Sequence, residues 1–377
     1  MTIFMQFSAK DRPTHRLGLA IAVAAALFGC GTRGTIAVVD PQQASTSVTR
    51  VIVATSRSAS AAPEFFSSGR DFTTNYARFD VSVPPDREVG KIRYPKGEPN
   101  LQTDFVVTDT RMLDGPNAFV SEVNAAAAAL PRGQRTGVFF VHGFNTNFAE
   151  SLIKNVQLKT DLASPGVDVL FSWPSEAKLL AYVADRENAL FTRESMAEVL
   201  TLMSRTNLSG YNLVAHSMGT FATMETLRTL ALSGDRATLN KINAVILISA
   251  DLEVDVFRRQ APPVLAAGVP IYLLVADDDK ALKLSAIVRG ERKRVGSVRS
   301  KEELGGLDVS IIDLSAIDSQ GDAGHLKVGS SPELIEFIRR IRASGVSIFD
   351  DDQKVGLFDQ GAVLLQTATG VVVGGVQ

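Results

Sequence analysis

The feature that most constrains this chain is a regular alternation of short apolar runs and helix-compatible stretches after about residue 118. The runs are rich in Val, Ile, Leu and Phe, which favours strands buried on both faces of a sheet. Strands are expected at 138–141, 167–171, 213–215, 245–248, 271–275 and 309–312. Helices are expected at 148–162, 187–204, 217–232 and 332–341. This alternation predicts an α/β fold, with a mostly parallel sheet flanked by helices.

The segment before this region has a different pattern. Residues 50–55 and 105–107 form short apolar runs, and residues 76–83 alternate polar and apolar side chains, as in a half-buried strand. We therefore expect a small N-terminal β-rich module over residues 49–117, leading into the α/β domain over residues 118–345.

The first 30 residues predict a secretory leader. Basic residues precede an apolar run over 17–28, which is shorter than the roughly 20 residues that a membrane-spanning helix needs and suits a signal peptide. The run ends at Phe28, two residues before Cys30, which is the only cysteine in the chain, so no internal disulfide is expected. The sequence Leu-Phe-Gly-Cys resembles a bacterial lipobox, which implies that Cys30 carries a lipid anchor. The alternative is an ordinary signal peptide with a chance cysteine.

The remaining boundaries follow from composition. Residues 31–48 are small and polar and are expected to be a tether, and residues 346–377 form a C-terminal extension with a Gly/Val-rich end. A lipid anchor at Cys30 would place the protein in the bacterial cell envelope, at the outer membrane or the periplasmic face. The formal net charge of −2 provides no basic field that would favour nucleic acid.

An apolar strand runs directly into Ser217, and a helix-compatible stretch follows. This is the context of a nucleophile elbow, in which a sharp turn lifts the serine hydroxyl above the edge of a sheet. Small residues two positions before and after the serine let strand and helix approach, and here these are Ala215 and Gly219. Alanine stands where glycine is commoner. The alternative is a serine that merely caps the next helix.

A serine nucleophile needs a base, because its hydroxyl is hardly ionised at neutral pH. The chain has four histidines. His15 lies in the leader, His142 precedes the serine, and His216 is its neighbour in the turn. Only His325 follows Ser217, as the chain order serine, acid, histidine requires, and His325 is therefore the expected base.

The base needs a carboxylate that fixes its tautomer. The expected acid is Asp279, which follows the strand over 271–275 after a short turn. Asp277 is the second choice, and Asp251, after the preceding strand, is another candidate. A metal site is a rival interpretation of the adjacent aspartates, but no histidine or cysteine cluster accompanies them. We expect neither a metal nor an organic cofactor.

An oxyanion hole needs two backbone N–H groups. One is expected from Met218, the residue after the nucleophile, and the other from Phe144, in the loop after the strand over 138–141. Gly143 lets this loop turn close to a substrate. We expect His142 to brace the loop by hydrogen bonds, and an inert core histidine is the alternative.

Seven segments of the chain match the motifs of one family. They are 53–57, 83–85 with Arg87, 141–146, 171–175, 215–219, 279–285 and 324–325. In these segments the chain resembles a bacterial α/β-hydrolase family of unknown function, often described as esterase/lipase superfamily enzymes. The resemblance implies the α/β-hydrolase fold and its triad. Because the family places its acid immediately before Lys-Ala-Leu, it favours Asp279 over Asp277. It implies little about substrate.

Residues 173–175, with Tyr182, Asp185 and Arg186, follow a predicted strand. They could line an acyl pocket or a lid, but core packing with an ion pair is favoured.

Together these residues predict a serine hydrolase that cleaves carboxylic esters, with a small-molecule ester as its substrate. One alternative is an envelope-anchored binding or scaffolding lipoprotein with a vestigial site, because a fold does not fix a function. Another is an acyltransferase or amidase that uses the same triad.

Overall fold

The computed structural model describes residues 33–44, 47–275, 293–313 and positions 332, 335, 336 and 339. The expected leader, Cys30 and the C-terminal extension lie outside these residues. The chain divides into two compact units, Met1–Gly34 and Thr35–Gln377, and the architecture below is that of the second. Among the described residues, no helix combines the length and apolar character needed to cross a bilayer.

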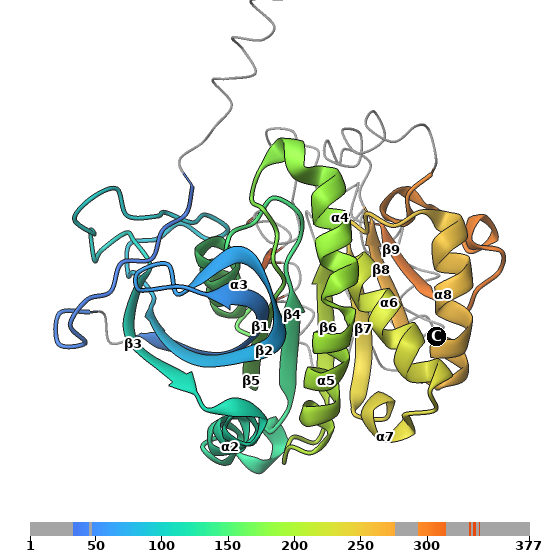
Figure 1. Ribbon diagram of the computed structural model, residues 1–377, viewed down its shortest axis with the longest axis horizontal. Coiled ribbons are helices and arrows are strands. Elements are labelled where there is room, and N and C mark those ends of the chain that lie inside the picture. Colours follow the sequence, from blue (N-terminus) through green and yellow to red (C-terminus); the bar gives the residue numbers. More distant parts are fainter. Residues whose placement is uncertain are drawn as a thin grey trace, which may run out of the picture. The chain divides into compact units, whose positions relative to one another are not determined.

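Nine strands form one sheet in the order β3-β2-β1-β5-β4-β6-β7-β8-β9 (Figure 1). The strands are β1 Val48–Ala59, β2 Phe66–Ser82, β3 Val106–Leu113, β4 Gly137–Val141, β5 Val167–Ser172, β6 Tyr211–His216, β7 Ile242–Ile248, β8 Ile271–Val275 and β9 Ser310–Asp313. β1 and β3 pair antiparallel with β2, and the other neighbours pair in parallel. The prediction of a mostly parallel sheet flanked by helices is confirmed.

Seven α-helices connect or precede these strands within the described residues. They are α2 Gly115–Ala128, α3 Phe148–Asp161, α4 Tyr182–Phe191, α5 Arg193–Ser204, α6 Gly219–Leu232, α7 Arg236–Leu239 and α8 Val254–Ala266. Short 3₁₀ turns lie at η1 Arg132–Gln134, η2 Leu179–Ala181, η3 Val295–Ser297 and η4 Glu302–Leu304. The expected helix over 187–204 is two helices, because α4 ends at Phe191 and α5 begins at Arg193. The expected helix over 332–341 lies mostly outside the described residues.

The core has two parts, one on each face of the sheet. Successive side chains of a strand point to opposite faces, so Ile52 and Ala54 of β1 belong to one apolar cluster and Val51 and Val53 to the other. The first cluster is shared with α2, α5, α6 and α8, and the second with α3. Figure 1 shows α5, α6 and α8 in front of the sheet. Helices therefore cover both faces.

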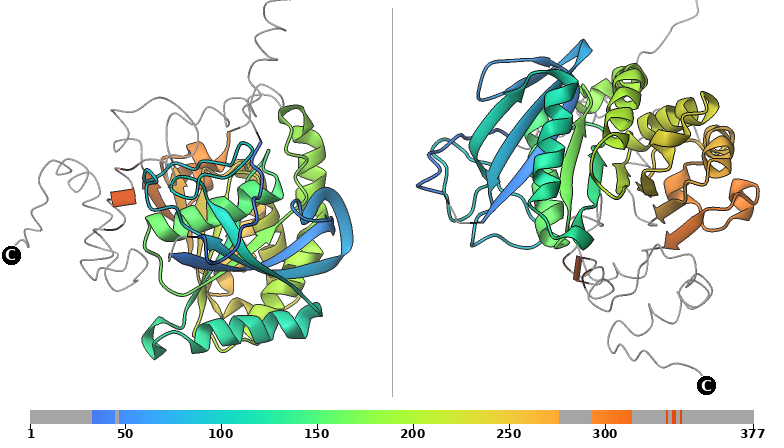
Figure 2. Two further views of the ribbon diagram at one scale, coloured as in Figure 1. Left: turned by 90° about the vertical axis from the view of Figure 1, so that its left-hand side faces the viewer. Right: turned by 90° about the horizontal axis from the view of Figure 1, so that it is seen from below.

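The three strands expected in residues 49–117 are present, and they extend the main sheet. β1 pairs in parallel with β5, with Val53 opposite Leu170. Figures 1 and 2 show the sheet continuing from these N-terminal strands, coloured blue to teal, to β9, coloured orange. The residues of the expected module thus share both a sheet and a core with the α/β part of the chain.

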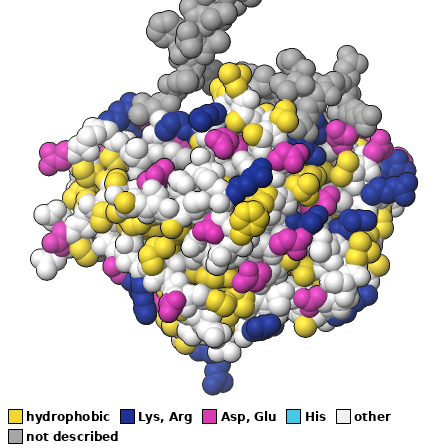
Figure 3. All heavy atoms as spheres, in the orientation of Figure 1, with side chains coloured by type: hydrophobic (Ala, Val, Ile, Leu, Met, Phe, Trp, Pro, Cys, Tyr) yellow, Lys and Arg dark blue, Asp and Glu magenta, His cyan; other side chains and the backbone are white. Residues whose placement is uncertain are grey.

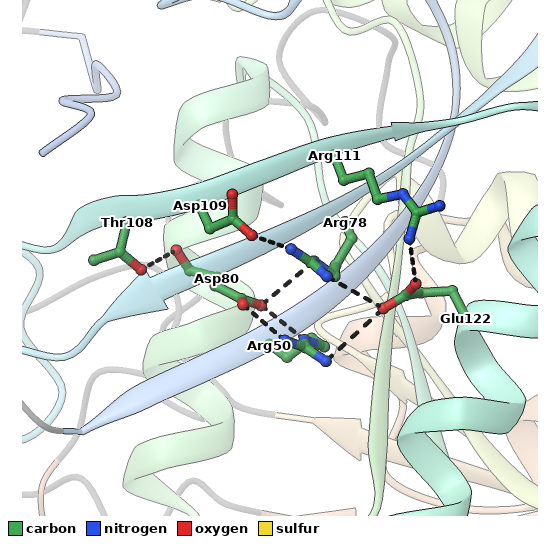
Figure 4. A network of polar contacts seen from close by, with 7 residues as sticks. All are labelled: Arg50, Arg78, Asp80, Thr108, Asp109, Arg111 and Glu122. Atoms are coloured by element: carbon green, nitrogen blue, oxygen red, sulfur yellow. Dashed lines mark hydrogen bonds and ion pairs between the residues drawn. The ribbon is translucent and has the colours of Figure 1, made fainter. Parts of the chain in front are cut away.

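An ion-pair network joins α2 to the N-terminal strands (Figure 4). The carboxylate of Glu122 on α2 lies 3.8–4.0 Å from the guanidinium groups of Arg50, Arg78 and Arg111. Asp80 and Asp109 balance two of these arginines from the strands themselves. Polar side chains therefore attach α2 where it crosses this part of the sheet.

The face of the molecule in Figure 3 carries basic and acidic side chains interspersed with apolar ones. Opposite charges also pair on the surface, as in Lys301 with Asp308 and Arg258 with Asp255. Such interspersed charges screen one another, so this face offers no large field of one sign.

Candidate active site

Ser217 lies at the junction of β6 and α6 with φ of 49°. Non-glycine residues rarely adopt this left-handed conformation, which stores strain that the surroundings must hold. The Ser217 N–H donates to Ile248 O at 2.9 Å, which ties the turn to the end of β7. α6 has no side-chain cap and begins at Gly219, so the alternative of Ser217 as a capping residue does not hold.

The small residues around the serine have measurable roles. A Cβ atom added to Gly219 would lie 2.4 Å from the carbonyl oxygen of His142, so no larger residue fits there without a backbone shift. Ala215 is fully buried in the core cluster. The extra methyl group at this position, where glycine is commoner, is accommodated by packing.

The loop after β4 lies against the serine turn. A Cβ atom added to Gly143 would lie 2.5 Å from His216 Nδ1 and 3.0 Å from Ser217 Cβ. The structure therefore brings the loop that carries Phe144 next to the turn that carries Ser217 and Met218. This is the arrangement that two backbone donors around one nucleophile require.

His142 is a buried part of this loop. Its Nε2 lies 3.1 Å from both the Trp173 N–H and Trp173 O. Because the N–H can only donate, we assign Nε2 as the acceptor and place the proton on Nδ1, which then donates to Gly143 O at 2.9 Å. The ring stacks on Trp173, with centroids 5.0 Å apart, and the indole Nε1 donates to His142 O at 2.7 Å. Burial lowers the pKa of His142 to about 3, so the ring is neutral. His142 braces the loop, as expected from the sequence.

The bond to Gly143 also orients the next amide. In a trans peptide the C=O and N–H groups point in opposite directions. Because Gly143 O points toward His142, the Phe144 N–H of the same peptide points away from it. His142 thus controls the direction of the expected oxyanion donor.

A second serine lies near His142. Ser172 Oγ is 3.3 Å from His142 Nε2, but Ser172 is fully buried, and its hydroxyl accepts from Arg57 Nε at 2.9 Å. This pair therefore fits a structural role in the core.

Asp279, Asp277 and His325 lie outside the described residues. The strands that lead to them are described: β8 ends at Val275 and β9 at Asp313. β6, β8 and β9 run in the same direction, so the chain leaves all three at the same edge of the sheet. The expected nucleophile, acid and base follow these three strands.

Asp251, the other candidate acid, lies close to the elbow. Its N–H is 3.4 Å from Ser217 O. Its carboxylate accepts from the Tyr182 hydroxyl and lies 3.5 Å from Arg294 Nε, and all three side chains are buried. The Tyr182 ring in turn packs edge-on against Phe144, with centroids 5.2 Å apart. The side chain of Asp251 is thus held by Tyr182 and Arg294, and Tyr182 links it to the loop after β4.

The segment over 173–175 is part of the core. Trp173 and Ser175 are fully buried, which agrees with the favoured packing interpretation. Asp185 accepts a hydrogen bond from Ser175 Oγ at 2.6 Å, and the Arg186 guanidinium lies 3.8 Å above the Phe221 ring.

Sequence reasoning missed the contribution of Arg57. This arginine is fully buried at the end of β1, and its guanidinium reaches both the loop after β4 and the segment after β5. The available signal was a charged residue three positions after the apolar run over 51–54, in a motif of the resembling family.

Comparison with known proteins gives one family match. The family described as "Alpha/beta hydrolase of unknown function (DUF900)" matches residues 122–342, more than half of the 377 residues. No curated protein in the comparison matches the chain.

Several solved structures are similar at low identity. One, of two fungal esterases from Rhizomucor miehei, has 12% identity and a TM-score of 0.34 over 79% of this chain and 83% of that chain. Another, a hyperthermophilic esterase from the archaeon Pyrobaculum calidifontis, has 12% identity and a TM-score of 0.34 over 90% of this chain and 92% of that chain. Similarity at this level says nothing about substrate.

The family match covers the strands and helices that carry the serine turn and the loop beside it. The sheet order and the strand–turn–helix around Ser217 agree with it. The chain therefore belongs to the family of α/β hydrolases of unknown function that matches residues 122–342.

Proposed function

We propose that this protein is a serine hydrolase that cleaves carboxylic esters, with Ser217 as its nucleophile. The observation that carries the proposal is the conformation of Ser217. Its φ of 49° occurs where a strand enters a helix, and only 8% of the residue is exposed. Strain of this kind concentrates at functional sites, where it is part of the mechanism.

In the proposed reaction, Ser217 Oγ attacks the ester carbonyl carbon while its proton passes to His325. The N–H groups of Phe144 and Met218 hold the negative charge that develops on the carbonyl oxygen. His325 then gives the proton to the leaving alkoxide, and an acyl-enzyme remains. Water, deprotonated by His325, attacks the acyl carbon and releases the acid and free Ser217. Asp279 orients His325 throughout.

Two features near the serine support the oxyanion assignment. Gly143 brings the loop into contact with the serine turn, as its added-Cβ distances indicate. The neutral His142 fixes the Gly143–Phe144 peptide by a hydrogen bond at 2.9 Å. Donors held in this way need no reorganisation when charge develops, which is why preorganised amides stabilise transition states.

Turnover of p-nitrophenyl butyrate tests the proposal. We expect Ser217→Ala to lower the rate by about 10⁴-fold or more, and a fluorophosphonate probe to label the wild type but not the variant. Equal rates in the two proteins would refute the assignment. Competing alcohol or amine acceptors test for acyl transfer, and amide substrates test for an amidase.

We further propose that the protein is a lipoprotein of the bacterial cell envelope, anchored through Cys30. The apolar run that ends two residues before this single cysteine supports the proposal. Cys30→Ser is expected to release the protein from the membrane fraction, and continued tight membrane association of the variant would argue against an anchor at this residue.

A further inference from the structure

The loop beside Ser217 contains a second non-glycine residue in the left-handed conformation. Asn145 directly follows Phe144 and has φ of 56°. Few non-glycine residues adopt this conformation, although asparagine tolerates it better than most, and the surrounding structure selects it. The contacts of Asn145 and Thr146 therefore identify what holds the loop in place.

Thr146 is held at both of its backbone groups. Its N–H donates to Ser175 Oγ at 3.2 Å, and its carbonyl oxygen accepts from Arg57 Nη2 at 2.8 Å. Burial raises the pKa of Asp185. A hydrogen bond from the backbone N–H of Asn145 to this carboxylate acts in the opposite direction and lowers that pKa. Three side chains from outside the loop thus hold the two residues that follow Phe144.

The same three side chains are joined to one another. Ser175 Oγ donates to Asp185 Oδ2 at 2.6 Å, and Arg57 Nη1 donates to Ser175 O at 3.3 Å. All three residues are buried. Ser175 lies between a buried cation and a buried carboxylate, and it contacts the loop itself. We call these three residues the loop anchor.

The composition of the loop anchor is costly for a purely structural role. Arg57 donates to hydroxyl and carbonyl oxygens of β2, β5 and the two loops, and burial lowers its pKa to about 9. Buried charges of this kind often contribute less to stability than apolar side chains of similar size. What the anchor does provide is directional control of backbone groups.

We propose that Arg57, Ser175 and Asp185 are positioning residues for the oxyanion hole, which hold Asn145 and Thr146 so that the Phe144 N–H stays aimed at the substrate oxygen. The inference rests on the proposed function, because it needs Phe144 to be a donor. His142 fixes this peptide from the side of Gly143, and the loop anchor fixes the backbone that follows it.

The expected effect is a loss of rate. Deleting one oxyanion donor lowers kcat by about 10²–10³-fold, and a donor that is only misdirected is expected to cost about 10–100-fold. Ser175→Ala removes one oxygen and breaks the contacts to Thr146 and Asp185. Arg57→Lys keeps the charge but not the fork that reaches several acceptors at once.

Ser56→Ala is a matched control. Ser56 precedes Arg57, is fully buried and shares a hydrogen bond with Thr192. Its replacement by alanine also removes a buried hydroxyl, but the hydrogen bond that is lost is to Thr192 and not to residues 143–147. The measured quantity is kcat/KM per active serine, titrated with a fluorophosphonate, so that unfolded protein is not counted.

A second measurement isolates the oxyanion hole. Sulfur accepts hydrogen bonds more weakly than oxygen, so an enzyme that uses these bonds prefers an oxygen ester to its thiono counterpart. We expect Ser175→Ala and Arg57→Lys to lower kcat/KM for p-nitrophenyl butyrate by about 10–100-fold and to reduce the preference over the thionobutyrate. Ser56→Ala should change neither by more than about twofold.

Two results would overturn the inference. One is a lower melting temperature with unchanged kcat/KM per active serine. The other is a lower rate with an unchanged oxygen-to-thiono preference. If Arg57→Lys does not fold, Ser175→Ala alone decides. Failure of the proposed function looks different, because wild type and Ser217→Ala would then have the same activity.

Discussion

At the scale of single residues, the serine turn is built by close backbone approaches. Gly219 lies against His142 O, and Gly143 lies against His216 and Ser217. Two glycines therefore allow β4, the loop after it and the serine turn to approach closely. Position 215 accepts the methyl group of alanine because this side chain packs in the core. The spacing of small residues in the sequence predicts this turn because only small residues fit where the backbone segments approach closely.

His142 leads to a prediction about acid stability. Burial lowers its pKa from 6.5 to about 3, so the unfolded chain binds a proton that the folded protein does not. Stability contributed by neutral His142 is therefore present above about pH 6.5 and is lost as the pH falls toward 3. Between pH 7 and pH 5 the loss is about 2 kcal/mol.

Comparison with His142→Asn isolates this contribution. The variant should be less stable than the wild type at pH 7, because the Gly143 and Trp173 contacts weaken, but its deficit should shrink by about 2 kcal/mol at pH 5. Denaturant unfolding of both proteins at the two pH values measures the difference. An equal deficit at both values would mean that His142 is protonated in the folded protein.

The functional residues that the sequence did not reveal have roles that depend on partners far away along the chain. Arg57 donates to Thr146 and Ser175, which lie 89 and 118 positions away. No local pattern encodes such a contact, whereas the elbow is encoded within five consecutive residues. Ser217 and Gly143 could therefore be predicted, but the loop anchor could not.

At the scale of elements, most strands were predicted within a few residues because each is a compact apolar run. The helices were less predictable. α8 contains Pro262 and Pro263, and proline normally interrupts a helix, so its sequence did not suggest one. The sequence predicts one helix over 187–204 because the helix-compatible pattern continues across Thr192, where the structure changes from α4 to α5.

Glu122 offers a test of how α2 is attached (Figure 4). Its side chain is 10% exposed and lies within 4.0 Å of three arginines. Glu122→Gln keeps the shape but leaves Arg78, 15% exposed, with less negative charge nearby. We expect a loss of about 1–2 kcal/mol in unfolding free energy at low salt, and a smaller loss at high salt.

Arg111→Gln is the matched control for Glu122→Gln. The Arg111 side chain is 65% exposed, so its pair with Glu122 should contribute less than about 0.5 kcal/mol. Denaturant midpoints at two salt concentrations measure both variants. Equal effects of the two substitutions would show that the burial of Glu122 is unimportant for the attachment of α2.

At the scale of the whole molecule, the sheet crosses the boundary that the change in sequence pattern suggested. The change at about residue 118 is real, because antiparallel pairing gives way to parallel β/α units there. The pattern could not reveal that β1 would pair with β5, since strand pairing between distant segments leaves no local signal. Fold class was therefore predictable, and the course of the sheet was not.

This arrangement predicts the behaviour of a fragment. A chain that starts at residue 118 lacks β1 and exposes the edge of β5 from Asp168 to Ser172, and it opens the core cluster that contains Val51 and Val53. We expect a fragment of residues 118–345 to aggregate or to lack a cooperative thermal transition, whereas a protein of residues 35–377 retains one. A soluble, cooperatively melting fragment would show that residues 118–345 fold independently.

The contacts of Arg57 also determine when its part of the structure can form during synthesis of the chain. Its guanidinium binds Ser67 O, 10 residues away, but the acceptors after β4 and β5 lie 89 to 118 residues further along the chain. During synthesis on a ribosome, β1 and β2 are complete long before those partners exist. Arg57 must remain hydrated until the loops after β4 and β5 arrive. Assembly of the loop anchor is therefore a late event in the biogenesis of this protein, although Arg57 is synthesised well before the loops that it binds.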